Sequence, residues 1–106
     1  MAESVQEFFD GLPSQFKADK AAGLSAVYQF DISGDGGGRW HADIEDGSLS
    51  VVEGAADAPT ITITAGDEDW LSIVNGRLNP QMAFMTGKLK VKGDMGLAMR
   101  LQSIFF

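Results

Sequence analysis

The feature that most constrains the fold is a series of three short segments in which apolar and polar residues alternate, at residues 28–33, 40–45 and 49–51. A repeat of two residues is typical of a β-strand with one buried face. The glycine-rich stretch 35–38 and the pair Asp46-Gly47 separate the segments and predict tight turns. The sequence therefore predicts three consecutive antiparallel strands.

Further elements flank these strands. Residues 5–16 place apolar side chains three and four positions apart after a capping-box spacing at Ser4, which predicts an amphipathic helix. We expect Pro13 to break or restart this helix, because proline lacks the amide hydrogen that a helix interior needs. The β-branched run at 60–64 predicts a fourth strand, and the acids at 67–69 favour the positive end of a helix dipole.

The last third of the chain adds two more helices and another strand. Asn79-Pro80 is typical of the cap and first position of a short helix, and the alternation at 88–92 predicts a fifth strand. Asp94 can cap a closing helix over residues 95–106. This order of elements, without repeats, predicts an α+β sheet covered by helices in a single domain, residues 1–106.

Composition excludes several classes of protein. The absence of cysteine removes disulfides and thiolate chemistry and makes the cytoplasm the expected location. The amino terminus lacks the basic and then apolar order of a secretion signal, and no apolar run approaches the length of a membrane span. The net charge of -7 opposes binding to nucleic acid, which is a polyanion.

The charge is unevenly distributed along the chain. Residues 1–87 hold fourteen acids and four bases, whereas residues 88–106 hold one acid and four bases. A locally basic segment can make transient contact with an anionic membrane surface. The residues predicted to make that contact are Lys88, Lys90, Lys92 and Arg100.

The usual components of catalysis are missing from the sequence. His41 is the only histidine, and neither a Gly-x-Ser-x-Gly elbow nor a His-Glu-x-x-His pair occurs. The glycines at 34–38 lack the Lys-Ser/Thr pair and the following helix of a phosphate loop, and strand patterns on both sides favour a hairpin turn. We therefore predict no enzyme activity, no metal site and no cofactor.

The closing helix is apolar around nearly its whole circumference. One arc suits the covering of a sheet and consists of Leu97, Ala98, Leu101, Ile104 and Phe105. A second arc consists of Met95, Met99 and Phe106, beside Gln102. The second arc needs an apolar neighbour of its own, which can be more of the core, a partner subunit in a homodimer, or a bound molecule.

Four of the five methionines fall within residues 82–99, close to this second arc. Methionine is flexible and polarizable, which suits a wall that adapts to varied ligands. Gln102 can meet a ligand head group there, or it can bond to backbone or water. The residues predicted to bind an apolar ligand are Trp70, Val74, Met82, Phe84, Met85, Met95, Met99, Leu101, Gln102, Phe105 and Phe106.

The run QMAFMTGKLKVKGDMGLAMRLQ, residues 81–102, resembles the sterol carrier protein type 2 family. Further resemblance lies in Tyr28-Gln29-Phe30-Asp31-Ile32, in Gly38-Arg39-Trp40, and in Asp67-Glu68-Asp69-Trp70 leading to Asn75-Gly76-Arg77-Leu78. The resemblance implies a five-stranded, mainly antiparallel sheet covered on one side by helices, with an apolar tunnel lined partly by the last helix. Eukaryotic members typically end in a peroxisomal address, whereas this chain ends in Ile104-Phe105-Phe106, so we expect a prokaryotic, cytosolic, stand-alone member.

The resemblance also implies a function. It implies non-catalytic binding and transfer of fatty acids, fatty acyl-CoA, phospholipids or sterol-like molecules. The alternative is a protein–protein interaction or accessory module, a homodimer or an enzyme-associated domain, that uses the surplus apolar face of the closing helix.

Overall fold

The computed structural model describes residues 3–105, with the side chains of residues 101, 102 and 105 outside that description. Its centre is one five-stranded sheet in the order β3-β2-β1-β4-β5. The strands are β1 (Ser25–Ser33), β2 (Gly38–Glu45), β3 (Ser48–Glu53), β4 (Ile61–Gly66) and β5 (Leu89–Gly93). Every neighbouring pair is antiparallel except β1 and β4. The prediction of a mainly antiparallel five-stranded sheet is confirmed.

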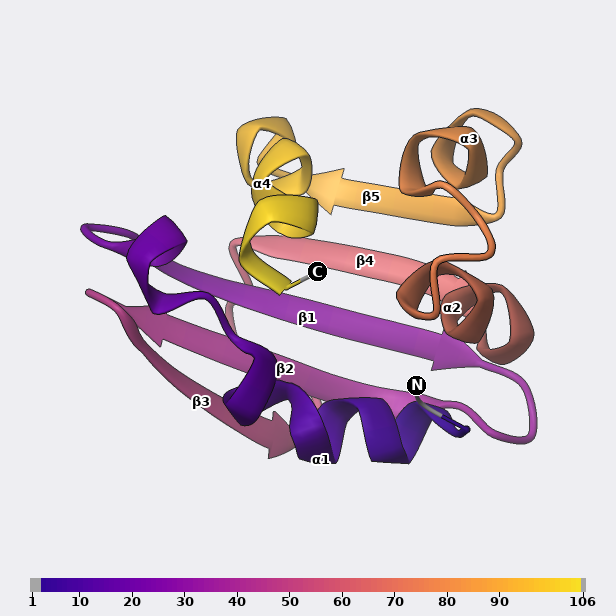
Figure 1. Ribbon diagram of the computed structural model, residues 1–106, viewed down its shortest axis with the longest axis horizontal. Helices are drawn as coiled ribbons and strands as arrows, with labels where there is room; N and C mark the ends of the chain where they lie inside the picture. Colours follow the sequence, from indigo (N-terminus) through magenta and orange to yellow (C-terminus); the bar gives the residue numbers. More distant parts are fainter. Residues whose placement is uncertain (1–2, 106) are drawn as a thin grey trace.

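The helices lie on one face of this sheet (Figure 1). They are α1 (Val5–Gln15), the short 3-10 helix η1 (Ala18–Ala21), α2 (Asp67–Val74), α3 (Pro80–Met85) and α4 (Met95–Phe105). Helix α1 packs near β3 and α2, whereas α3 lies beside β5 and α4 crosses β4 and β5. No helix within residues 3–105 is long and apolar enough to cross a membrane.

The core lies between the sheet and the helices and is built around aromatic rings. Alternate residues of β1, among them Tyr28 and Phe30, point into it and are buried. Phe9 of α1 stacks on Trp40 with ring centroids 4.5 Å apart and lies 6.1 Å from the parallel ring of Trp70. Such pairs add about 0.5–1.5 kcal/mol each beyond the area that they bury.

Backbone geometry explains both hairpin turns. Asp46 and Gly47 have φ of 45° and 83°, and two successive positive angles match the twist of the flanking strands. In the first hairpin, a Cβ on Gly37 would clash with the backbone carbonyl oxygen of Ile32, so only glycine fits. The three predicted strands and their two turns are thereby confirmed.

The expectation that Pro13 breaks the first helix was wrong, because α1 continues to Gln15. Proline removes one amide donor, but its fixed φ is itself helical. The next turn closes normally, since the amide of Phe16 donates to the carbonyl of Leu12 at 2.9 Å. Burial of Val5, Phe8, Phe9 and Leu12 on one side of α1 then holds the helix on the core.

The connection from β3 to β4 is held on the sheet face opposite the helices. The side-chain oxygen of Gln29 accepts from the amide of Ala56 at 3.0 Å, and His41 Nδ1 lies 2.9 Å from the carbonyl oxygen of Gly54. The bond to Ala56, together with one from Gln29 Nε2 to a carboxylate oxygen of Asp31 at 2.9 Å, pairs the buried side chain of Gln29. After this connection β4 pairs in parallel with β1, and β5 forms the edge of the sheet.

Candidate functional site

An apolar groove lies between α3, β5 and α4, with a volume of about 350 Å³. Its floor comes from β5, where Leu89 and Val91 turn toward the helices while the alternating lysines turn to the other face. The residues that line it are Pro80, Gln81, Phe84, Met85, Leu89, Val91, Met95, Ala98 and Met99.

Local sequence signals fix the two helical walls. The side-chain oxygen of Asn79 accepts from the amides of Gln81 and Met82, with Pro80 at the first helical position. One oxygen of Asp94 accepts from the amides of Gly96 at 2.8 Å and Leu97 at 3.3 Å. Both predicted caps are confirmed, and each fixes the start of a wall.

The two predicted sides of α4 face different neighbours. Leu97 and Ile104 are buried in the core. Met95 and Met99, one helical turn apart on the predicted second arc, line the groove. Ala98 was predicted on the sheet-covering arc but also lines the groove. The small side chain of Ala98 leaves room between the methionines and β5.

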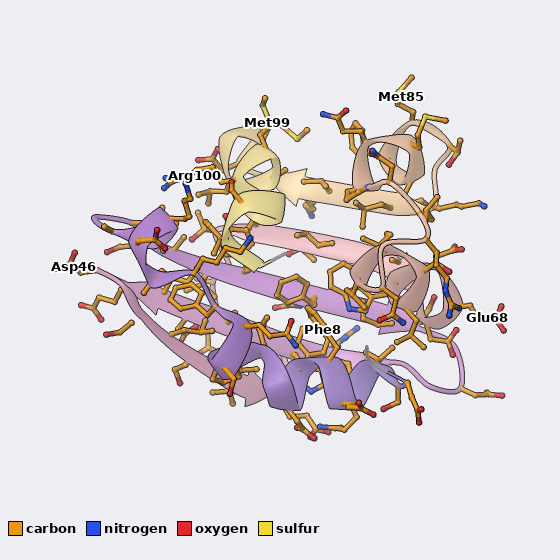
Figure 2. The ribbon with its side chains drawn as sticks, in the orientation of Figure 1. Phe8, Asp46, Glu68, Met85, Met99 and Arg100 are labelled. Atoms are coloured by element: carbon orange, nitrogen blue, oxygen red, sulfur yellow. The ribbon has the colours of Figure 1, made fainter. Side chains whose placement is uncertain are left out.

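The rim of the groove is apolar and exposed. The side chain of Met85 is 78% exposed and that of Met99 is 82% exposed, and Phe84 and Met95 are also exposed. Figure 2 shows Met85 and Met99 pointing away from the body of the protein, from α3 and α4 respectively. Contiguous exposed apolar side chains around a groove are typical of ligand-binding and interaction surfaces.

Polar contacts hold α4 from its other side. The hydroxyl of Tyr28 donates to the carbonyl oxygen of Leu97 at 2.9 Å. Arg100 Nη2 donates to the carbonyl oxygen of Lys20 at 3.0 Å. The backbone amide of Lys17 donates to the carbonyl oxygen of Ile104 at 3.2 Å. The groove side of α4 is thus left to apolar side chains.

Burial raises the pKa of Tyr28 to about 12 from its ordinary value of 10.0. The positive charge of Arg100 lowers this pKa and the negative charge of Asp94 raises it, both by smaller amounts than burial. The phenol therefore stays neutral throughout the physiological range and remains a hydrogen-bond donor to α4.

The structure brings only some of the predicted ligand-binding residues together. Phe84, Met85, Met95 and Met99 line the groove, whereas Met82 is exposed on α3 outside the lining. On α2, Trp70 is fully buried beside Phe8, Phe9 and Phe30, and Val74 is half-buried away from the groove. The side chains of Leu101, Gln102, Phe105 and Phe106 lie outside the described residues, so their role stays a prediction.

Sequence reasoning missed several groove residues, namely Pro80, Gln81, Leu89, Val91 and Ala98. The alternation of Leu89 and Val91 with lysines was a usable signal, because it assigns both side chains to the helix-covered face. Arg100 is exposed, donates to the carbonyl oxygen of Lys20 on η1 and points away from the groove (Figure 2), and its predicted membrane contact stays a prediction.

A second, smaller pocket of about 200 Å³ lies between α1 and β3. The rings of Phe9 and Trp40 that border it are already buried in the core. The exposed carboxylates of Asp10 and Glu53 also border it, and they disfavour an alkyl chain. Within residues 3–105, no group of three or more histidines and acids is placed to hold a metal ion.

Comparison with known proteins finds one family along nearly the whole chain. The model of the SCP-2 sterol transfer family matches residues 5–106. Hydroxysteroid dehydrogenase-like protein 2 of Xenopus tropicalis is 36% identical over 101 residues, which cover 94% of this chain and 24% of that protein. Sterol carrier protein 2 of Homo sapiens is 38% identical over 84 residues, which cover 76% of this chain and 15% of that protein.

Solved structures agree with the fold. The solution structure of palmitated SCP2L2 from Aedes aegypti has a TM-score of 0.80 and 27% sequence identity, and the match covers 94% of this chain and 92% of that one. The match therefore spans nearly all of that solved chain. It spans about a quarter of the length of the hydroxysteroid dehydrogenase-like relatives that it matches.

Proposed function

This chain belongs to the SCP-2 sterol transfer family, and from that premise we propose that it binds lipids in the groove between α3, β5 and α4 and transfers them without covalent chemistry. The apolar lining of the groove carries the proposal. Among the described residues that line it, Gln81 alone has a polar side chain, and none is ionisable. Such a surface recognises hydrocarbon by shape and leaves a polar head group near the mouth.

The size of the groove favours a slender cargo. Its volume of about 350 Å³ is at the lower end of the roughly 300–1,000 Å³ of small-molecule sites. Fatty acid, fatty acyl-CoA, phospholipid and sterol-like molecules are the candidate cargoes. The similar Aedes aegypti protein is described as palmitated, which favours a single acyl chain as the first cargo to test.

The energetics suit reversible carriage. Burial of about ten methylenes contributes roughly 8 kcal/mol at about 0.8 kcal/mol each. Association costs at least about 4 kcal/mol in lost translational and rotational freedom. The remaining balance of about 4 kcal/mol corresponds to a dissociation constant of about 1 mM for such a segment, and each further buried methylene strengthens binding while release stays fast.

The test begins with native mass spectrometry of gently purified protein, followed by titration with a fluorescent fatty acid. Met85→Glu and Met99→Glu should each weaken binding at least about tenfold, since a carboxylate at the rim opposes an alkyl chain. Met82→Glu is the matched control, because Met82 is an exposed methionine on the same helix as Met85 but outside the lining. A folded protein with no adduct and no saturable binding would exclude the proposal.

A second candidate is an accessory module for an enzyme. It is favoured by the relatives named hydroxysteroid dehydrogenase-like, of which this chain matches only about a quarter. In that role the exposed rim would contact another protein or a second copy of this chain. Sedimentation at micromolar concentration distinguishes lipid carriage from the accessory role, because a monomeric protein that carries lipid disfavours the accessory role. The cytoplasm is the proposed location, on the basis of the cysteine-free sequence.

A further inference from the structure

We propose that the edge of the molecule at β5 docks on anionic lipid bilayers. This docking edge consists of Met85 and Met99 at the rim of the groove and Lys88, Lys90 and Lys92 along the strand. The proposal goes beyond cargo binding, because it concerns the surface that the protein contacts rather than the molecule in its groove. It also assigns an orientation in which the groove opens toward the membrane.

The apolar part of the docking edge is already outside the core. Met85 and Met99 are the most exposed of the large apolar side chains among the described residues, and they flank β5 from α3 and α4. In Figure 2 both point outward on the side of the protein where β5 forms the edge of the sheet. Flexible methionine side chains at such an edge can enter the boundary between head groups and acyl chains without unfolding anything.

The basic part follows the same strand. Lys90 pairs in register with Thr64, and Lys92 with Thr62, so both side chains leave β5 on the face opposite the groove. All three lysines are exposed, and within residues 3–105 none of them forms an ion pair with a carboxylate. Their long stems can follow the edge while the ammonium groups reach lipid phosphates.

The rest of the protein has the opposite charge. Residues 1–87 hold fourteen acids and four bases, a net charge of -10, whereas residues 88–106 hold four bases and one acid, a net charge of +3. Three of these four bases are the lysines of the docking edge, so an anionic surface repels the acidic part of the molecule and favours contact at this edge. The charge distribution selects the orientation as well as the partner.

Other docking arrangements fit the structure less well. Two copies that met symmetrically through this edge would bring their lysines together. Helix α1 does not offer an apolar surface for docking on a bilayer. Its large apolar residues are buried in the core, namely Val5, Phe8, Phe9 and Leu12. A bilayer with anionic head groups satisfies both the exposed methionines and the unpaired lysines.

The experiment measures partitioning of the protein onto vesicles of phosphatidylcholine alone and of phosphatidylcholine mixed with phosphatidylserine. We expect binding to the mixed vesicles only, and weaker binding as salt rises. Lys90→Gln and Lys92→Gln should each lower the partition coefficient about fivefold at low ionic strength. Lys20→Gln is the matched control, because it removes the same charge from an exposed lysine on η1.

The methionines are tested separately. Met99→Ser should lower partitioning onto mixed vesicles several-fold, whereas Val52→Ser, at an exposed apolar residue of β3 distant from β5, should leave it unchanged. Fatty acid titration in the absence of vesicles should be unaffected by the lysine variants, which separates a failure of docking from a failure of cargo binding. Equal partitioning of Lys90→Gln, Lys20→Gln and unaltered protein, or equal binding to both vesicle types, would overturn the proposal.

Discussion

Replacement of Tyr28 by phenylalanine should loosen α4 at neutral pH and make folding less sensitive to alkali. The hydroxyl of Tyr28 is buried beneath α4 and donates to the carbonyl oxygen of Leu97 at 2.9 Å. Tyr28→Phe removes this one donor and preserves the ring that packs in the core. The change therefore isolates the contribution of a single hydrogen bond between the sheet and α4.

At pH 7 the expected loss is about 1 kcal/mol of the free energy of unfolding, within the range of about 0.5–1.5 kcal/mol for a neutral hydrogen bond. The carbonyl of Leu97 can still accept from the amide one turn later in α4, which keeps the loss in this range. For a domain of this size, a loss of about 1 kcal/mol lowers the melting temperature by about 4–8 °C.

The dependence on pH has a definite sign. Burial raises the pKa of Tyr28 to about 12, whereas the unfolded chain titrates near 10.0. Below pH 10 the phenol is neutral in both states and its contribution is complete. Between pH 10 and pH 12 the unfolded chain loses the proton first, so stability falls by up to about 1.4 kcal/mol per pH unit. The total loss is about 2–3 kcal/mol.

The assay combines denaturant unfolding from pH 7 to pH 12 with an absorbance titration of tyrosinate. Tyr28 is the only tyrosine in the chain, so the absorbance change belongs to this residue alone. All other ionisable groups are the same in both proteins, so the difference between the two unfolding curves removes their contribution. The unaltered protein should be the more stable at pH 7 and the less stable above about pH 11.

Two results would refute this reasoning. Parallel stability curves from pH 9 to pH 12 would show that Tyr28 titrates alike in the folded and unfolded states. An absorbance titration of the folded protein with a midpoint near the ordinary tyrosine value would show that the phenol is open to water. Either result would show that the hydrogen bond from Tyr28 to Leu97 does not stabilise α4.

Three other substitutions follow from local geometry. Asp94→Ala removes the cap of α4 and should cost about 1 kcal/mol in thermal unfolding, most of which Asp94→Asn should restore. Phe9→Ala empties the centre of the aromatic cluster and should cost about 3–5 kcal/mol in denaturant unfolding; a loss below about 1 kcal/mol would mean that the core is loosely packed there. Gly11→Ala lies inside α1, where an added Cβ meets only an ordinary contact at 3.7 Å, and should raise stability by about 0.5–1 kcal/mol. A drop in melting temperature for Gly11→Ala would contradict the helical assignment of that position.

Much of the architecture could be predicted from the sequence because its causes are local. The alternation in residues 28–33 and 40–45 reflects a sheet with one buried face, and Asp46-Gly47 reflects a turn that needs positive φ. Caps such as Asp94 act on amides two and three residues away. Each of these signals can be recognised within a few residues, without knowledge of the rest of the chain.

The position of the groove depended on contacts between distant segments. Leu89, Val91 and Ala98 line it only because the β3–β4 connection places β4 beside β1, which leaves β5 at the edge between α3 and α4. Trp70 shows the same dependence, since its place in the aromatic core is set by rings from α1 and β1.

The sequence by itself determined which residues form strands and helices and where most of these begin, because hydrogen bonds and dihedral preferences act over a few residues. Only the tertiary structure decided which apolar side chains became core and which line the exposed groove. Arg100 illustrates the difference: the sequence shows its charge, but only the fold places its guanidinium against a carbonyl eighty residues earlier in the chain. Burial depends on the packing of whole elements. Leu97 and Met99 lie on the same helix and both have apolar side chains, but Leu97 is buried in the core and Met99 is exposed.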